Sequence, residues 1–152
     1  MEASKTNLKT RSNRIFHSLL KKLDPVLHSH LVSQGIQPEL ILIKWLKCLV
    51  SREFDLKSLF EIWDYLFSGF KPELVPLTTT NTDHLHLLDY LSLALIRHSR
   101  TSFLQGDYTD CLMIAMKPLD LTEAAPIIEA AELYRRLLRP QDFPSTPLVS
   151  LK

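Results

Sequence analysis

The stretch from Trp45 to Phe67 constrains the fold more than any other part of the sequence, because it holds both tryptophans of the chain. Its apolar residues recur at helical spacing on both sides of a short polar corner, 51–55, which is centred on Phe54. Such spacing predicts two amphipathic helices. Each aromatic side chain buries roughly 150–250 Å², so we predict a helical hairpin with an aromatic inner face. The residues of that face are Trp45, Leu46, Leu49, Val50, Leu59, Phe60, Ile62, Trp63, Leu66 and Phe67.

The rest of the chain extends this pattern into an all-α fold of about seven helices. Proline or aspartate stands at several expected helix starts, as at Asp24, Pro38 and Asp55, and Gly35 stands where a helix would end. The run 40–43 has strand character, but no second strand-like run exists to pair with it. We therefore expect helices at 12–23, 25–33, 38–50, 55–68, 83–104, 108–116 and 122–138.

Polarity divides the chain into three parts. We expect a disordered lead over residues 1–11, a helical domain over 12–139, and a proline-rich tail without regular structure over 140–152. Within the domain, 71–83 contains two prolines and a threonine-rich turn, which is typical of a mobile loop. The helix after this loop is apolar around most of its circumference, so we expect it to be the central helix of the bundle.

Composition argues against several classes of protein. The 152 residues include 18 basic and 17 acidic side chains, and a formal net charge of +1 does not support binding to nucleic acid or anionic membranes by bulk charge. Cys48 and Cys111 lie in apolar helical patterns, so we expect buried thiols rather than a disulfide or a zinc site. The N-terminus is polar, and no apolar run reaches the roughly 20 residues of a membrane helix. We expect a soluble intracellular protein.

A search for catalytic and metal-binding patterns finds none. His28 and His30, like His84 and His86, are two residues apart, and this spacing splits each pair across opposite sides of a helix. The sequence contains no G-x-S-x-G elbow, and its three glycines are too far apart to form a phosphate-binding loop. The sequence thus predicts no catalytic residue, no metal site and no cofactor.

The polar corner admits two interpretations. Arg52 and Glu53 form either a contact point for a partner or a structural ion pair and helix cap, and the structural interpretation is favoured because corner charges usually serve helix ends. Trp63 is expected in the core. Asp64 is expected to satisfy a nearby buried donor rather than to perform chemistry.

The same residues carry a resemblance to a known family. The series contains Ile36-x-Pro38, Trp45, Arg52-Glu53-Phe54-x-Leu56, Leu59 and Ile62-Trp63-Asp64-x-Leu66-Phe67. It resembles the C-terminal half of the TBC domain, which is the domain of the GTPase-activating proteins of Rab GTPases. The resemblance covers about residues 13–140. Later residues are most like the member 5 type of this family, namely Leu88-Asp89-Tyr90, Ile96-Arg97, Tyr108-Thr109-x-Cys111-Leu112 and Met116-Lys117-Pro118.

The resemblance also says which residues would carry the chemistry. The family accelerates GTP hydrolysis with an arginine from an I-x-x-D-x-x-R motif and a glutamine from a Y-x-Q motif, both in its N-terminal half. Arginine fingers supply on the order of 10³–10⁵ in rate. Neither motif occurs in these 152 residues. No residue of the chain is therefore assigned a catalytic role, and we expect that the chain is not an enzyme.

The resemblance implies a partial Rab GTPase-activating protein, with a Rab-type small GTPase as its partner in membrane trafficking, inactive as an activator by itself. The chain is then either a fragment of a full TBC protein or a shortened paralogue that binds without catalysing. The alternative is a non-catalytic helical binding module for a Rab or a trafficking adaptor, and a helical scaffold unrelated to GTPases is a third possibility. The implied location is cytoplasmic, peripheral on endosomal membranes. We also expect an exposed apolar face where the other half of the domain would pack.

Overall fold

The computed structural model describes residues 2–68 and 86–138, with side chains from Asn7 onward. All regular elements in these ranges are helices, and the described residues form no strand beyond one isolated bridge between Phe54 and Leu121. This confirms the predicted all-α class. The loop predicted at 71–83, the helix start predicted at 83 and the tail predicted at 140–152 lie outside the described residues.

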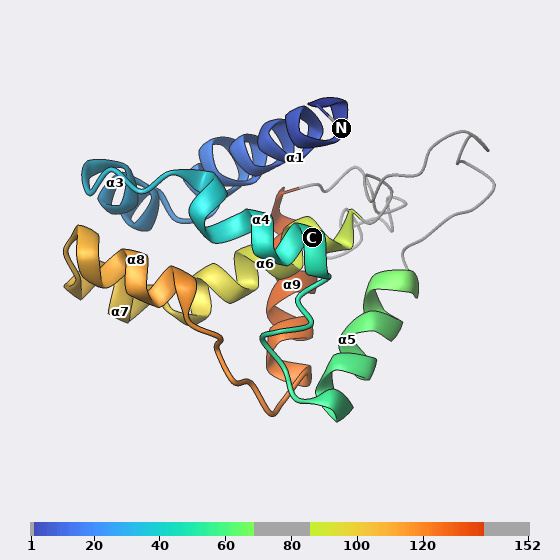
Figure 1. The fold of residues 1–152 in the computed structure, drawn as a ribbon. Helices are drawn as coiled ribbons and strands as arrows, with labels where there is room; N and C mark the ends of the chain where they lie inside the picture. Colours follow the sequence, from blue (N-terminus) through green and yellow to red (C-terminus); the bar gives the residue numbers. More distant parts are fainter. Residues whose placement is uncertain (1, 69–85, 139–152) are drawn as a thin grey trace, which may run out of the picture.

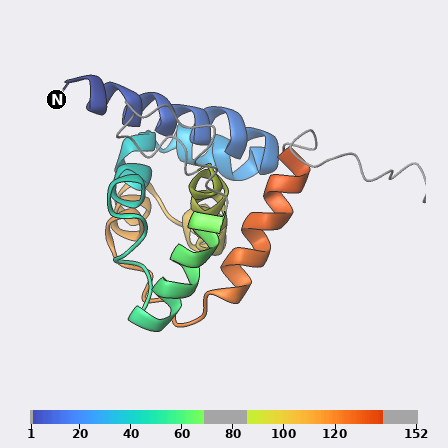
Figure 2. The ribbon, with the colours of Figure 1, turned by 90° about the vertical axis from the view of Figure 1, so that its right-hand side faces the viewer.

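The chain begins with a long helical rod rather than with a disordered lead. α1 (Glu2–Asn13) continues through the π-helical η1 (Arg14–Leu20) into α2 (Lys21–Leu23), and Figure 2 shows this rod in blue along the top of the molecule. The expectation of disorder over 1–11 is therefore wrong. Leu8 packs against the core and Arg11 is buried against a distant carboxylate, so tertiary contacts outweigh the polar composition of the segment.

The next two helices follow the local signals closely. α3 (Pro25–Ser33) begins at the Asp24 side chain, which accepts a hydrogen bond from the backbone N–H of Leu27. It ends at Ser33, and Gly35, with a φ of +77°, closes a Schellman turn in which the Ile36 N–H donates to the Leu31 carbonyl. α4 (Pro38–Cys48) ends two residues before the predicted position 50, because Leu49 and Val50 adopt left-handed conformations.

After the polar corner, the structure describes five helices: α5 (Leu56–Ser68), α6 (Leu87–His98), α7 (Arg100–Gln105), α8 (Tyr108–Met116) and α9 (Ala125–Leu138). The single helix predicted over 83–104 is divided at Ser99, whose φ and ψ of −96° and 15° are not helical. α9 begins later than the predicted residue 122, because Leu121 pairs with the backbone of the polar corner instead.

α6 is the central helix, as predicted. Every residue from Leu87 to Ile96 is buried, including Asp89 and Ser92. In Figure 1 it crosses the middle of the molecule, with α4 on one side and α9 alongside it, and α9 packs extensively against it. Among the described residues, no helix is both long and apolar enough to cross a membrane.

The prediction that both cysteines are buried is confirmed for one of them and wrong for the other. Cys111 is fully buried, and burial followed by the nearby carboxylates of Asp110 and Asp107 raises the pKa of its thiol. Cys48 is exposed at the last turn of α4, which contradicts the predicted buried position.

Candidate functional site

The family-motif residues at and before the polar corner between α4 and α5 differ in exposure. Trp45, Glu53 and Phe54 are 3%, 1% and 8% exposed, whereas Arg52 between them points to solvent. The ammonium group of Lys44 lies 5.2 Å from the centroid of the Trp45 ring, a cation–π contact. No acceptor among the described residues reaches the buried indole N–H of Trp45. Three of these four motif residues are therefore buried, and only Arg52 is exposed.

Glu53 joins this corner to the loop between α8 and α9. Its Oε1 lies 3.4 Å from Lys44 Nζ, and its Oε2 accepts a 2.8 Å hydrogen bond from the backbone N–H of Leu119. Two backbone bonds extend the joint, because Leu121 N–H donates to the Glu53 carbonyl and Asp55 N–H donates to the Leu121 carbonyl. Glu53 is thus a structural residue that holds two loops far apart in sequence, but its partners are Lys44 and the Leu119 N–H rather than Arg52 or a helix end. The cap of α5 is Asp55, which accepts from the Ser58 N–H.

Trp63 links α5 to the end of α4. Its indole Nε1 donates a 2.9 Å hydrogen bond to the Leu49 carbonyl, one of the acceptors that a helix C-terminus leaves without an intrahelical partner. Trp63 is half-buried rather than fully in the core. Asp64 is exposed, so the described residues give no support for its expected role as the partner of a buried donor.

An apolar stripe runs along the outer side of α5. It consists of Leu56, Phe60, Trp63 and Phe67, which are spaced four, three and four residues apart, and we call it the α5 stripe. Phe60 and Phe67 are 54% and 51% exposed, so their predicted place on the inner face is wrong. The apolar residues of α5 that are fully buried are Leu59, Ile62 and Leu66. The α5 stripe is an exposed apolar face of the kind that the resemblance implies.

Asp24 is the centre of an ion-pair cluster. The sequence indicated Asp24 only as a helix cap and did not predict its arginine partners. Its Oδ2 accepts hydrogen bonds from Arg100 Nε at 2.6 Å and from Arg97 Nε at 3.2 Å. Burial by itself would raise the pKa of this carboxyl, but the hydrogen bonds from Arg100 and from the Leu27 N–H, with the positive charges of both arginines, lower it. Arg97 also donates to the hydroxyl of Tyr134, so the cluster ties α3, α6, α7 and α9 together.

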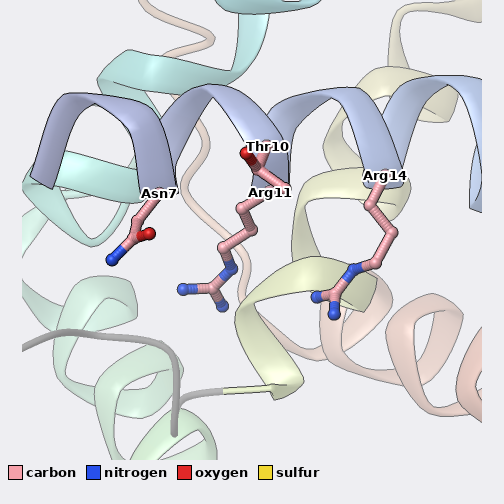
Figure 3. A pocket seen from close by; sticks show the side chains of 4 residues that line it. All are labelled: Asn7, Thr10, Arg11 and Arg14. Atoms are coloured by element: carbon pink, nitrogen blue, oxygen red, sulfur yellow. The ribbon is translucent and has the colours of Figure 1, made fainter. Parts of the chain in front are cut away.

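Asp89 is a second buried carboxylate with two arginine partners. Its side chain is 4% exposed, and it accepts a 2.7 Å hydrogen bond from Arg11 Nε and another from Arg14 Nη2. Figure 3 shows Arg11 and Arg14 extending from the same side of the N-terminal rod. The signal for this site was present in the sequence, because a lone carboxylate in an otherwise apolar, all-buried helix requires a cationic partner. The sequence did not show which partner.

The histidines form two small contacts rather than a metal site. His17 Nδ1 and His28 Nε2 are 3.1 Å apart and share a hydrogen bond between η1 and α3, and His30 Nε2 lies 3.0 Å from the Gly106 carbonyl. Burial, then the neighbouring His17 and Lys21, lower the pKa of His28. Over the ranges 2–68 and 86–138, no three histidine, cysteine or acidic residues gather closely enough to hold a metal ion.

The arginines that the structure describes mostly serve these clusters. Arg11 and Arg14 bind Asp89, Arg97 and Arg100 bind Asp24, and Arg135 binds Glu132. The first four guanidiniums hold helices together across long stretches of sequence, whereas Arg135 pairs with Glu132 within α9. In the part of the chain that the structure describes, the arrangement is a helical framework with an exposed apolar stripe, and nucleophiles, acids and bases do not converge in one cleft there.

Comparison with known proteins places this framework in context. The sequence model described as the Rab-GTPase-TBC domain matches residues 1–104. TBC1 domain family member 5 of Mus musculus is 32% identical over 107 residues, which are 70% of this chain and 12% of that protein. The Homo sapiens protein of the same name is equally similar, with the same coverage of both chains.

A second relative lies outside the member 5 group. TBC1 domain family member 13 of Homo sapiens is 30% identical over 116 residues, which are 76% of this chain and 26% of that protein. These matches confirm the resemblance read from the residues, including the member 5 type. The chain spans about one-eighth of the member 5 proteins that it matches, at 12% of their length. No solved structure matches the chain.

Proposed function

Because this chain belongs to the Rab-GTPase-TBC domain family, we propose that it is a partial Rab GTPase-activating module that binds Rab-type small GTPases in membrane trafficking without supplying the catalytic groups. The observation that carries the proposal is the family match over residues 1–104 in a chain that contains neither finger motif. Its proposed place is the cytoplasmic face of membranes, endosomes in particular, where its Rab partner would be held.

The arginine geometry supports the non-catalytic part of the proposal. An arginine finger must reach the charge that develops on the transferred phosphoryl group. Arg11 is buried against Asp89, and Arg97 and Arg100 share Asp24. Moving any of these guanidiniums to a nucleotide would break an ion pair inside the framework. For Arg11, whose side chain is 5% exposed, breaking the buried pair costs roughly 3–5 kcal/mol, which disfavours such a movement.

The α5 stripe favours a second candidate function, a non-catalytic binding module for a Rab or a trafficking adaptor. Leu56, Phe60 and Phe67 are each more than half exposed on one helix side. Exposed apolar residues that form a contiguous surface mark sites of protein interaction. In this alternative, the chain would hold its partner through the α5 stripe and leave the rate of GTP hydrolysis unchanged.

Two measurements on one panel of purified Rab proteins test these proposals. The first is single-turnover GTP hydrolysis with the chain in excess, for which we expect no acceleration. A hundredfold increase for any Rab would contradict the non-catalytic assignment, because arginine fingers supply on the order of 10³–10⁵ in rate. The second is binding of the chain to each Rab loaded with a non-hydrolysable GTP analogue or with GDP. Absence of binding to every Rab would contradict the Rab partner.

A variant pair tests whether the α5 stripe is the binding surface. Phe60→Ser interrupts the α5 stripe, and Leu133→Ser removes an equally exposed apolar residue from α9 as the matched control. If the stripe is the binding surface, Phe60→Ser weakens binding of the GTP-loaded Rab while Leu133→Ser does not. Equal binding by both variants would show that the partner is held elsewhere on the chain.

A further inference from the structure

A shallow hollow lies where α7 meets α8, on the side of the molecule opposite α5 (Figure 1). Its volume is about 360 Å³, and its described lining comes from both helices and from Gly106 in the turn between them. Ligand pockets measure roughly 300–1,000 Å³, so the hollow can hold a few side chains of a partner. It is separate from the α5 stripe.

The turn between the two helices is anchored by hydrogen bonds. The Asp107 side chain caps α8 in a capping box with Asp110. The Gly106 carbonyl lies 3.0 Å from Nε2 of His30, which belongs to α3. A wall that is fixed in this way does not have to be ordered when a ligand binds, which lowers the entropy cost of binding.

The wall that α8 supplies is apolar in the middle and charged at its ends. Asp110, Met113, Ile114 and Lys117 follow one another at three-, one- and three-residue steps, the spacing of neighbours on a helix surface. Met113 is 51% exposed, and Ile114 is half-buried and packs against the core. The flexible methionine side chain adapts its shape to a ligand, so this part of the wall suits an apolar side chain.

The charges at the two ends have opposite signs. Asp110 and Asp107 stand at the start of α8, and Lys117 follows its last residue. At 1.5 Å per residue, Asp110 and Lys117 are about 10 Å apart along the helix. Among the described residues, no carboxylate pairs with the Lys117 ammonium group, whereas Lys44, which donates to the Lys117 carbonyl, is paired with Glu53. The hollow therefore favours a cation at one end and an anion at the other.

The wall that α7 supplies is polar and neutral. It presents the exposed side chains of Ser102 and Gln105, neither of which has a hydrogen-bond partner among the described residues. The primary amide of Gln105 has donors and an acceptor side by side, so it matches the N–H and C=O groups of a peptide backbone.

We propose that this hollow binds an extended segment of a partner protein with the pattern basic–x–apolar–x–acidic. Alternate side chains of an extended chain point the same way, so the three patterned side chains reach the α8 wall together, the apolar one on Met113 and Ile114. Its charged residues are about 13 Å apart at 3.3 Å per residue, and their long side chains bridge the difference from the span between Asp110 and Lys117. The site is independent of the proposed action on Rab GTPases.

A short peptide is the probe for the first test. It is a blocked peptide of the sequence Ser-Arg-Thr-Leu-Thr-Glu-Ser, in which threonine favours the extended conformation. The full chain is titrated with the peptide, and backbone amide signals are followed by nuclear magnetic resonance. We expect saturable shifts in α7 and α8 with a dissociation constant of roughly 1 mM, and about fivefold weaker binding when serine replaces the leucine. Absence of saturable shifts in these helices would overturn the proposal.

Charge exchange makes the test specific. Lys117→Glu should weaken binding of the first peptide about fivefold, and it should restore binding of a second peptide in which lysine replaces the glutamate. Asp110→Asn keeps an oxygen for the Asp107 N–H and should weaken both peptides about threefold. Lys57→Glu makes the same charge change on exposed α5 and should bind as the unaltered chain does. If Lys117→Glu, with its other signals unchanged, binds both peptides equally, the proposal is refuted.

Two further results would place the interaction elsewhere. Shifts of the α7 and α8 signals with protein concentration, before any peptide is added, would show that a second copy of the chain fills the hollow. Peptide-induced shifts confined to α5 would show that the peptide binds the α5 stripe. Either result overturns this site and leaves the expected outcome of the Rab binding measurements unchanged.

Discussion

Replacement of Glu53 by alanine tests whether the polar corner is a structural joint. The change removes the acceptor of the Leu119 N–H and the ion-pair partner of Lys44 in a site where Glu53 itself is 1% exposed. Removing one partner of a buried charge pair costs roughly 3–5 kcal/mol. The Lys44 side chain is 18% exposed and can still be hydrated after the change. The lower end of this energy range therefore applies, and we expect a loss of about 3 kcal/mol in the free energy of unfolding.

The assay is urea unfolding followed by tryptophan fluorescence, since Trp45 and Trp63 both lie beside the joint. With a slope of about 2 kcal/mol per molar urea, the expected loss lowers the midpoint by roughly 1.5 M. Glu53→Gln keeps an oxygen that can accept from Leu119 N–H and loses only the charge, so we expect a smaller cost of about 1–2 kcal/mol.

Glu61→Ala is the matched control, because Glu61 is an exposed glutamate on α5. Exposed substitutions away from special features change stability by about 0.5 kcal/mol or less. If Glu53→Ala costs no more than Glu61→Ala, the corner is not a joint and its charge is available for another role. If Glu53→Gln costs as much as Glu53→Ala, the hydrogen bond to Leu119 contributes nothing beyond the ion pair.

Three further substitutions follow from the geometry. Gly35→Ala should cost about 1–2 kcal/mol in urea unfolding, because its φ of +77° disfavours any Cβ even though the added atom meets nothing within 4 Å; an unchanged midpoint would contradict this. Asp89→Asn should lower stability by about 2–4 kcal/mol, because it leaves the buried Arg11 facing a neutral group, and a loss below that of Glu61→Ala would refute it. For His28, the lowered pKa means that the unfolded chain takes up the proton more readily. The free energy of unfolding should therefore fall as the pH drops below about 6.5. Urea midpoints measured at several pH values should show that this part of the fall is absent in His28→Gln. A pH profile of His28→Gln identical to that of the unaltered chain would refute the role of His28.

Local sequence signals predicted the helix ends that short-range hydrogen bonds control. Asp24, Asp55 and Asp107 accept from the backbone N–H groups of residues three positions later, and Gly35 closes α3 with its left-handed backbone. The groups that make these bonds are always neighbours in the chain, so the residue types suffice. The same reasoning located the central helix, because a helix that is apolar all round can only be buried.

The sequence-based predictions were wrong where the order or burial of a segment depends on residues that are distant in the sequence. The polar composition of residues 1–11 predicted disorder, but Leu8 packs on the core and Arg11 reaches Asp89, which is 78 residues away. The periodicity of α5 predicted Phe60 and Phe67 on the inner face, yet both are about half exposed, while Leu59, Ile62 and Leu66 are buried and Trp63 and Tyr65 pack partly against the core. Periodicity gives the apolar residues of a helix, and it does not give the width of the surface against which the helix packs.

The sequence by itself determined the all-α class, most helix ends and the family, because these follow from residues that are close in the chain or from a motif of fixed spacing. Tertiary structure alone decided the two carboxylate clusters and the joint at Glu53. The physical reason is that a buried charge requires a partner, and the chain can supply that partner from any helix that packing brings within hydrogen-bond distance.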